Sequence, residues 1–182
     1  MAGVLRKVLY LLGILNDQDI DWMVRNGLRK QVPAGTSIIQ EGQPSEALFF
    51  VLAGEFGVTS GKMKGEISHV LEGEVIGEVS FVDSRPPSAT VTAKRDSMVG
   101  AVPAPLLRQK LEDDLGFASR FYKSMAVTLA DRLRAQSTMG YKAPAGSGIE
   151  DDDEDDIAPE QLDALSMAGS RFAEMKRRRW GA

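Results

Sequence analysis

The chain has 182 residues, with 22 basic and 26 acidic side chains and a formal net charge of −4 at pH 7. This length is enough for one domain with a substantial core plus extensions, and the acidic total argues against a chain devoted to nucleic-acid binding. The chain has no cysteine and one histidine, His69, which excludes disulfides and leaves no basis for a zinc site or a histidine-based triad. From these absences we predict no metal site, no catalytic residues and a protein that is not an enzyme.

The N-terminal part predicts two short helices. The apolar run at residues 4–12 fits a packed helix better than a signal peptide. Residues 17–26 repeat apolar side chains at helical spacing, with Asn16 and Asp17 as the cap and Gly27 as the stop. No apolar run reaches the roughly 20 residues of a membrane span. We therefore expect a cytoplasmic protein with no membrane contact.

From residue 28 the pattern changes to short apolar or alternating runs separated by glycine and proline turn signals. The runs are 28–32, 36–40, 47–52, 55–60, 67–71, 75–76, 88–93 and 98–102. Many short strands at this spacing are typical of a β-sandwich or barrel.

The C-terminal half predicts helices on both sides of an acidic segment. A short helix is expected over 105–111, and a long one over 117–135 because its apolar residues recur every fourth position. Residues 137–158 hold glycine, proline and a run of seven acidic residues, which predicts a disordered linker. Residues 159–180 form a further amphipathic pattern that ends in the basic run 176–179. We read this run as a solvated helix end or a partner for the acidic run, in preference to a contact with nucleic acid or lipid. The expected units are therefore 1–136, the linker 137–158 and a helical tail 159–182.

The segment 77–93, GEVSFVDSRPPSATVTA, carries the clearest chemistry. Gly77 permits a tight entry, residues 78–82 suit one short helix, and Pro86 with Pro87 imposes a rigid corner before a strand. Backbone N–H groups at such a helix start favour an anion.

This segment resembles the phosphate-binding cassette of the cyclic-nucleotide-binding domain family, in which a Gly-Glu pair precedes a short helix and an Arg-x-Ala-Thr motif. The resemblance spans residues 10–136 in element order. It implies a double-stranded β-helix (jelly-roll) barrel of about eight strands, with N-terminal helices and a long C-terminal helix. That last helix closes over the ligand in the family and often forms the dimer seam, so we expect a homodimer through 117–135. The family's transcription factors carry a helix-turn-helix motif after this helix, and its absence here argues against DNA binding.

The resemblance also assigns roles within the cassette. Glu78 corresponds to the glutamate that accepts a hydrogen bond from the ribose 2′-OH, and its alternative role is a structural cap. The arginine that pairs with the cyclic phosphate is replaced by Pro87, and the nearest guanidinium is that of Arg85. Arg85 could compensate or could simply lie at an exposed loop tip. The predicted ligand-binding residues are Gly77, Glu78, Val79, Ser80, Arg85, Ser88, Ala89 and Thr90.

Two functions follow. The first is a non-catalytic regulatory module that senses cyclic AMP, cyclic GMP or a related small phosphate ligand and signals through its last helix; no other cofactor is expected. The alternative is a degenerate domain of the same fold that binds no nucleotide and serves as a protein-interaction adaptor through its long helix and its tail, 159–182. Losing one charge-assisted hydrogen bond at Pro87 costs about 1.5–3 kcal/mol, which weakens cyclic nucleotide binding without excluding it.

Overall fold

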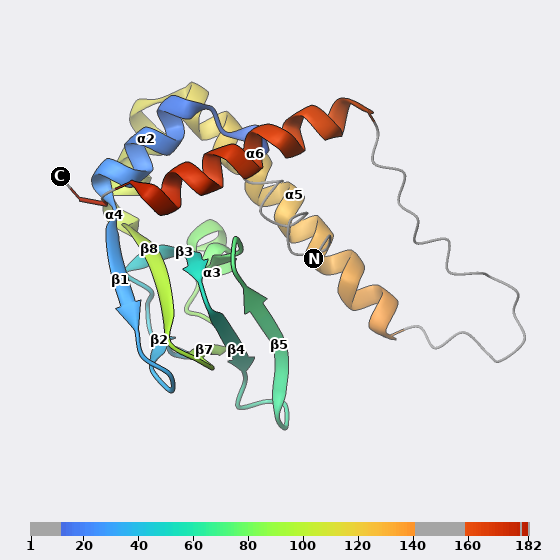
Figure 1. The fold of residues 1–182 in the computed structure, drawn as a ribbon. Coiled ribbons are helices and arrows are strands. Elements are labelled where there is room, and N and C mark those ends of the chain that lie inside the picture. The colour runs from blue at the N-terminus through green and yellow to red at the C-terminus, as the bar shows by residue number, and fades with distance from the viewer. Residues whose placement is uncertain (1–11, 141–158, 179, 182) are drawn as a thin grey trace, which may run out of the picture.

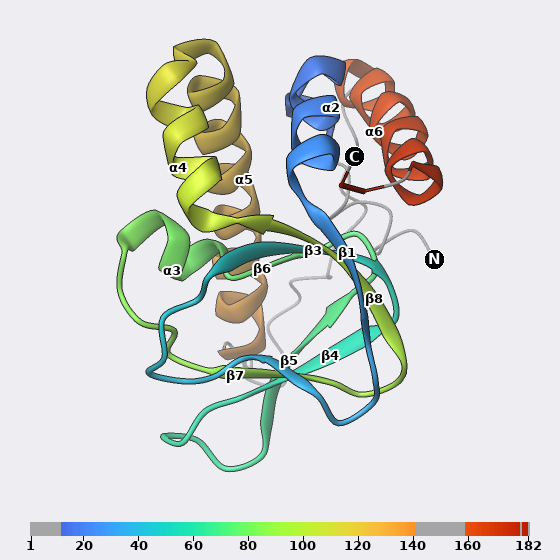
Figure 2. The ribbon, with the colours of Figure 1, turned by 90° about the vertical axis from the view of Figure 1, so that its left-hand side faces the viewer.

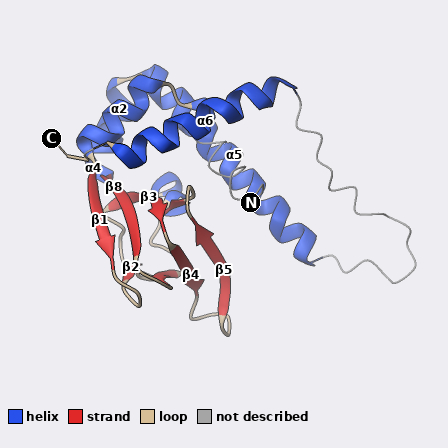
Figure 3. Cartoon of the chain, in the orientation of Figure 1, coloured by secondary structure: helices blue, strands red, loops and turns tan. Residues whose placement is uncertain are grey.

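The computed structural model describes residues 12–140, 159–178 and 180–181, and it holds a mainly β core with helices at one end (Figures 1 and 3). The strands are β1 Leu28–Val32, β2 Ser37–Ile39, β3 Ala47–Ala53, β4 Glu55–Thr59, β5 Glu66–Leu71, β6 Val75–Ile76, β7 Thr90–Ala93 and β8 Ser97–Pro103. The helices are α2 Asp17–Asn26, α3 Glu78–Asp83, α4 Ala104–Asp113, α5 Leu115–Gly140 and α6 Pro159–Arg177. All eight predicted strands are present, with boundaries shifted by at most two residues at each end. The helix expected over 4–12 falls almost entirely outside the described residues.

The strands form two four-stranded sheets, ordered β1-β8-β3-β6 and β2-β7-β4-β5, and every described strand pair is antiparallel. This confirms the prediction of a mainly β fold of about eight strands. The two sheets share an apolar core that includes Phe49, Val51, Phe56 and Val91.

Strand β3 shows why the helices gather on one sheet. Its side chains alternate between the two faces, as strand geometry requires. Phe49 and Val51 contribute to the core between the sheets, whereas Leu48, Phe50 and Leu52 belong to a second core formed with the helices. Because both faces of β3 are buried, its sequence is a nearly continuous apolar run. Figure 2 shows α2, α4, α5 and α6 stacked beyond the sheet that contains β3 and β8.

Helix α2 begins as expected, but its end has a different cause. The Asn16 side chain accepts from the Asp19 backbone N–H, and the Asp19 carboxylate accepts from Asn16 N, each at 2.9 Å. Gly27 has φ −98°, which is not the left-handed conformation of a glycine stop. A Cβ at Gly27 would lie 2.7 Å from the Trp180 ring, so the position requires a small residue for lack of space.

Two C-terminal boundaries differ from the expectation. Helix α5 continues through residues 137–140, which we had assigned to the linker, and residues 141–158 lie outside the described part of the chain. Helix α6 was expected to be available to a partner, but its buried side chains belong to the helical core of its own chain: Ala168, Met175 and, just beyond the helix, Trp180. The basic run pairs with Glu72, Asp21 and Glu174, whereas the acidic run 150–156 lies outside the described residues. Among the helices of the described segments, none has the length and apolar character needed to span a membrane.

Candidate functional site

The cassette enters through a glycine that the geometry requires. Gly77 has φ 94°, and a Cβ there would lie 3.2 Å from Ile39 Cδ1 and 3.4 Å from the Ala47 carbonyl oxygen. A side chain would therefore be strained in its backbone and crowded by its neighbours. Ser84 closes α3 with φ 59°, a left-handed conformation that few non-glycine residues adopt. The short helix predicted over 78–82 is confirmed as α3.

Glu78, the first residue of α3, is the buried charge of the site, with an exposed fraction of 2%. Its carboxylate accepts a hydrogen bond from the guanidinium of Arg132 on α5. Arg132 also donates from Nη2 to the Val75 carbonyl oxygen at 2.8 Å. Burial raises the pKa of Glu78 above its ordinary value; Arg132 opposes this rise, and the nearby Glu74 adds to it. The pair links the cassette directly to the long C-terminal helix.

Arg132 is a residue of the candidate site that the sequence analysis missed. It lies seven residues after Met125 and eleven after Phe121, so it falls on the same helical face as these buried side chains. An arginine on an apolar stripe needs an acidic partner in the protein interior. The position of Arg132 on the apolar face of the helix could therefore have indicated a buried acidic partner, although it did not identify Glu78 as that partner.

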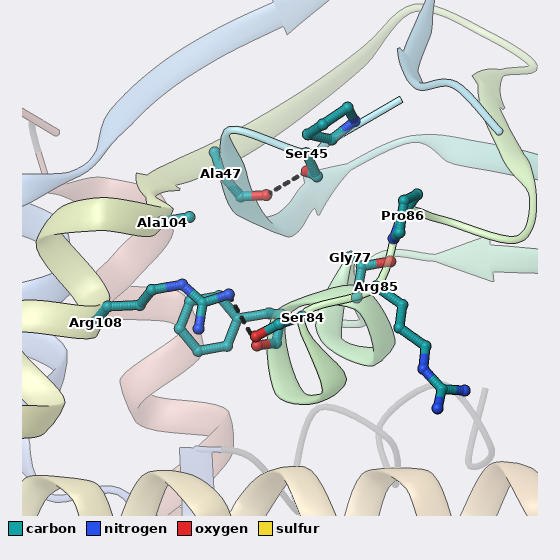
Figure 4. A pocket seen from close by; sticks show the side chains of 11 residues that line it. Ser45, Ala47, Gly77, Ser84, Arg85, Pro86, Ala104 and Arg108 are labelled. Atoms are coloured by element: carbon teal, nitrogen blue, oxygen red, sulfur yellow. Dashed lines mark hydrogen bonds between the residues drawn. The ribbon is translucent and has the colours of Figure 1, made fainter. Parts of the chain in front are cut away.

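A small cavity of about 150 Å³ lies between α3, the loop before β3 and the start of α4 (Figure 4). It is lined by Gly77, Ser80 and Arg85 together with Pro44, Ser45, Ala47, Phe81, Ser84, Pro86, Ala104 and Arg108. Arg108 stacks over the Phe81 ring at 4.6 Å and donates to the Phe81 carbonyl oxygen at 3.1 Å. The Arg85 side chain extends away from Ser45 and Ala47 in Figure 4. Three predicted ligand residues therefore border this cavity, but Glu78 does not.

The end of the cassette is fastened to a neighbouring turn. Pro87 is buried, and its carbonyl oxygen accepts from Gly42 N at 2.8 Å. The Thr90 hydroxyl accepts from the Glu41 backbone N–H at 3.1 Å, while Ala89 is half-buried. Val79 and Ser88, which we also predicted as ligand residues, are exposed. The structure therefore separates the predicted set into four groups: the buried Glu78, three residues at the cavity border, the half-buried Ala89 and Thr90, and the exposed Val79 and Ser88. Among the described hydrogen bonds, the guanidinium that reaches Glu78 comes from α5 and not from the cassette.

Comparison with known proteins places these features in a family context. The family model for the cyclic nucleotide-binding domain matches residues 29–114. A cAMP-dependent protein kinase regulatory subunit of Aspergillus fumigatus is 34% identical over 67 residues, which are 37% of this chain and 16% of that relative. A Thermus thermophilus catabolite activator protein superimposes with a TM-score of 0.57 at 23% identity, covering 69% of this chain and 58% of that one. A cyclic nucleotide-binding domain from Methylobacillus flagellatus gives a TM-score of 0.63 at 19% identity, covering 78% and 88%.

A second group of relatives corrects one prediction. Lysophospholipase NTE1 of Chaetomium globosum is 28% identical over 150 residues, 80% of this chain and 9% of that protein. An NTE family protein of Mycobacterium tuberculosis is 23% identical over 159 residues, 87% of this chain and 26% of that protein. We expected a protein that is not an enzyme, and this similarity to a named lipase over most of the chain contradicts that expectation. The lack of cysteines and of a histidine cluster in this chain did not predict enzyme status correctly, because the chain spans only 9% and 26% of the length of these relatives.

Proposed function

Residues 29–114 belong to the cyclic nucleotide-binding domain family, and from this membership we propose that the chain is a regulatory module that binds a cyclic nucleotide or related small phosphate ligand at cassette 77–93. The observation that carries the proposal is the buried Glu78–Arg132 pair, because it connects the cassette to α5. A ligand hydroxyl that binds Glu78 would displace Arg132 and would therefore act on α5.

The charges suggest how a ligand would be held. Glu78 is an acceptor suited to a ribose hydroxyl, the role implied by the family's Gly-Glu pair. A cyclic phosphate keeps its negative charge and needs a cation or several N–H donors when it is buried. Pro87 supplies neither. Arg132 has an exposed fraction of 29% and a long side chain, so it can turn from Glu78 toward a phosphate once a hydroxyl replaces it.

The output would be a change in α5. A ligand shifts a conformational equilibrium only through its different affinity for the two states. Exchange of the Arg132 partner supplies such a difference, because the arginine is fixed to Glu78 in one state and to the ligand in the other. We further propose that α5 contributes a homodimer contact through 117–135, where Tyr122 is 48% exposed. The chain covers only 9–26% of its NTE family relatives and of the fungal kinase subunit, so the activity regulated would reside in another domain or protein.

The alternative is an interaction module of the same fold that binds no nucleotide. Two observations favour it: Pro87 replaces the phosphate-binding arginine, and Arg132 already occupies the acceptor Glu78. In that case the ion pair would serve only to fix α5 for contact with a partner.

Isothermal titration calorimetry with cyclic AMP and cyclic GMP distinguishes the two functions. The proposed function predicts a saturable heat, and Glu78→Gln should weaken binding by about tenfold or more because one charge-assisted hydrogen bond is lost. Glu112→Gln, which changes an exposed carboxylate on α4, should bind as the wild type does. No heat at millimolar ligand would overturn the proposal and support the interaction module.

A further inference from the structure

The C-terminal segment 166–181 is anchored on the domain by one aromatic side chain. Trp180 has an exposed fraction of 6%, and its Nε1 donates to the Met175 carbonyl oxygen at 3.1 Å. A Cβ at Gly100 on β8 would lie 2.3 Å from the ring, and one at Gly27 would lie 2.7 Å from it. Neither glycine has a positive φ, so these positions are small to make room for the indole. The two glycines form a notch in which Trp180 sits.

The C-terminal segment and the domain each donate a hydrogen bond to a carbonyl oxygen near the end of the other's helix. The last carbonyls of a helix have no partner within the helix. Gly181 N donates to the Val24 carbonyl oxygen near the end of α2, at 3.2 Å. In return, Arg29 Nη1 on β1 donates to the Lys176 carbonyl oxygen near the end of α6, at 3.3 Å. If the segment leaves, both ends lose a donor.

Acidic side chains on α2 pair with two arginines of the C-terminal segment. Asp17 accepts from Arg171 at 2.7 Å, and Asp21 accepts from Arg178. Arg171 also donates to the Leu12 and Leu15 carbonyl oxygens at 2.8 and 2.6 Å, ahead of α2. Figure 2 shows the two helices side by side.

Helix α2 also contacts α5, through Asp19. Asp19, itself buried, accepts two hydrogen bonds from Arg120 on α5, at 2.6 and 2.8 Å. The rings of Trp22 on α2 and Phe117 on α5 lie 5.7 Å apart. Helix α2 therefore contacts α6 and α5 at once, and α5 carries Arg132.

Few buried side chains attach α6 to the rest of the domain. Its buried side chains between residues 166 and 177 are Ala168 and Met175, and its ion pairs to α2 are partly exposed and so contribute little. Gly169 lowers the helix propensity at the middle, where a Cβ would meet nothing within 4 Å. Segments with few buried apolar contacts open at lower free energy than the whole domain.

We propose that residues 166–181 form a releasable clasp on α2, anchored by Trp180, and that the clasp fixes α5 through the Asp19–Arg120 pair. Undocking of the segment frees the end of α2, which loosens the support of α5 near its first turns, where Arg120 pairs with Asp19. The C-terminal segment is thus a second input to the helix that holds Glu78, and it acts without any ligand in the cassette.

Hydrogen–deuterium exchange on the full chain without ligand tests the clasp. The variants are Trp180→Ala, Gly100→Ala and their combination, with Arg177→Ala as the control because Arg177 is 74% exposed and pairs with Glu174 of its own helix. Trp180→Ala and Gly100→Ala should each raise exchange by about tenfold or more in residues 166–178, and also raise it in 17–26 and 115–121. Gly100→Ala should add nothing once Trp180 is removed, because the clash is with the ring.

Three results would overturn the proposal. One is unchanged exchange in 166–178 when Trp180 is removed. Another is a Gly100→Ala effect of equal size with and without Trp180. The third is faster exchange in α6 alone, with 17–26 and 115–121 unaffected, which would make the segment an appendage without influence on α5. If the Trp180 variant does not fold, Arg178→Ala gives the same comparison with a milder change, because it removes the ion pairs of Arg178 with Asp21 and Glu174 and leaves the indole in place.

Discussion

Replacing Arg132 with alanine should destabilise the protein far more than an ordinary substitution on a half-exposed helix face. The change leaves the carboxylate of Glu78 buried without its cation. Removing one partner of a buried ion pair costs about 3–5 kcal/mol, because the remaining charge stays desolvated. Lys123→Ala, which removes an exposed cation from the same helix, should change the free energy of unfolding by less than about 0.5 kcal/mol.

The pH dependence gives this prediction a second signature. Burial raises the pKa of Glu78 in the folded state above the value of 4.5 that applies in the unfolded chain. The folded state therefore binds the proton more tightly, and the free energy of unfolding falls as pH rises from about 4.5 through the folded pKa. Arg132 opposes the rise, so its removal should extend this loss of stability to higher pH. The penalty of Arg132→Ala should be larger at pH 8 than at pH 5.

Urea denaturation at pH 5, 6, 7 and 8 measures both effects. The double variant Glu78→Gln/Arg132→Ala should recover much of the lost stability and should lose most of the pH dependence, since it has no buried carboxylate. A cost below about 0.5 kcal/mol for Arg132→Ala at pH 7, or an equal cost at pH 5 and pH 8, would refute the reasoning.

Two further predictions concern packing, one within the cassette and one at the turn between β3 and β4. Phe81→Ala should lower the free energy of unfolding, measured by urea denaturation, by about 3–5 kcal/mol, because the ring is buried and lies 5.7 Å from the Phe121 ring. Val82→Ala, at an exposed position, should leave that free energy nearly unchanged. Similar costs for the two substitutions would contradict this packing. Gly54→Ala should lower the thermal midpoint of unfolding much more than Gly35→Ala. Both glycines have positive φ, but only the Cβ at Gly54 would meet another side chain, Ser97 Oγ at 2.0 Å. Equal shifts of the midpoint would show that backbone strain alone decides the cost.

The strands could be predicted from the sequence because each one carries its own signal. Strand β3 is a continuous apolar run bounded by turn residues, and β1 and β8 were located within one residue at each end. The start of α2 was equally local, since Asn16 and Asp19 satisfy each other three residues apart.

The contacts on which the two proposals rest are not local in sequence. Glu78 and Arg132 are 54 residues apart in sequence, and nothing in the periodicity of α5 identifies the acid that faces its arginine. The notch for Trp180 is harder still, because it joins Gly27 and Gly100 to the end of the chain. A glycine at a helix end predicts a left-handed cap, and only the packed structure reveals that the indole ring needs the space.

The sequence predicted the backbone conformation of the cassette correctly, but it predicted the placement of the side chains only in part. The glycine entry and the short helix follow from residues 77–82, and both are found. The direction of each side chain depends on surrounding elements, which bring Glu78 inward and leave Val79 and Ser88 exposed. The replacement of the arginine by Pro87 was visible in the sequence, but the guanidinium from α5 that faces Glu78 was not.

Nuclear magnetic resonance of the arginine side chains tests the exchange of partners at Glu78 most directly. In the free protein the Arg132 guanidinium N–H signals should be protected from solvent exchange, and Glu78→Gln should reduce that protection, leaving the bond to the Val75 carbonyl oxygen. Saturating cyclic AMP should shift these signals as the ligand hydroxyl replaces the arginine at Glu78. Arg132 signals that do not change while the ligand saturates another site, or that resemble those of an exposed arginine in the free protein, would contradict the account.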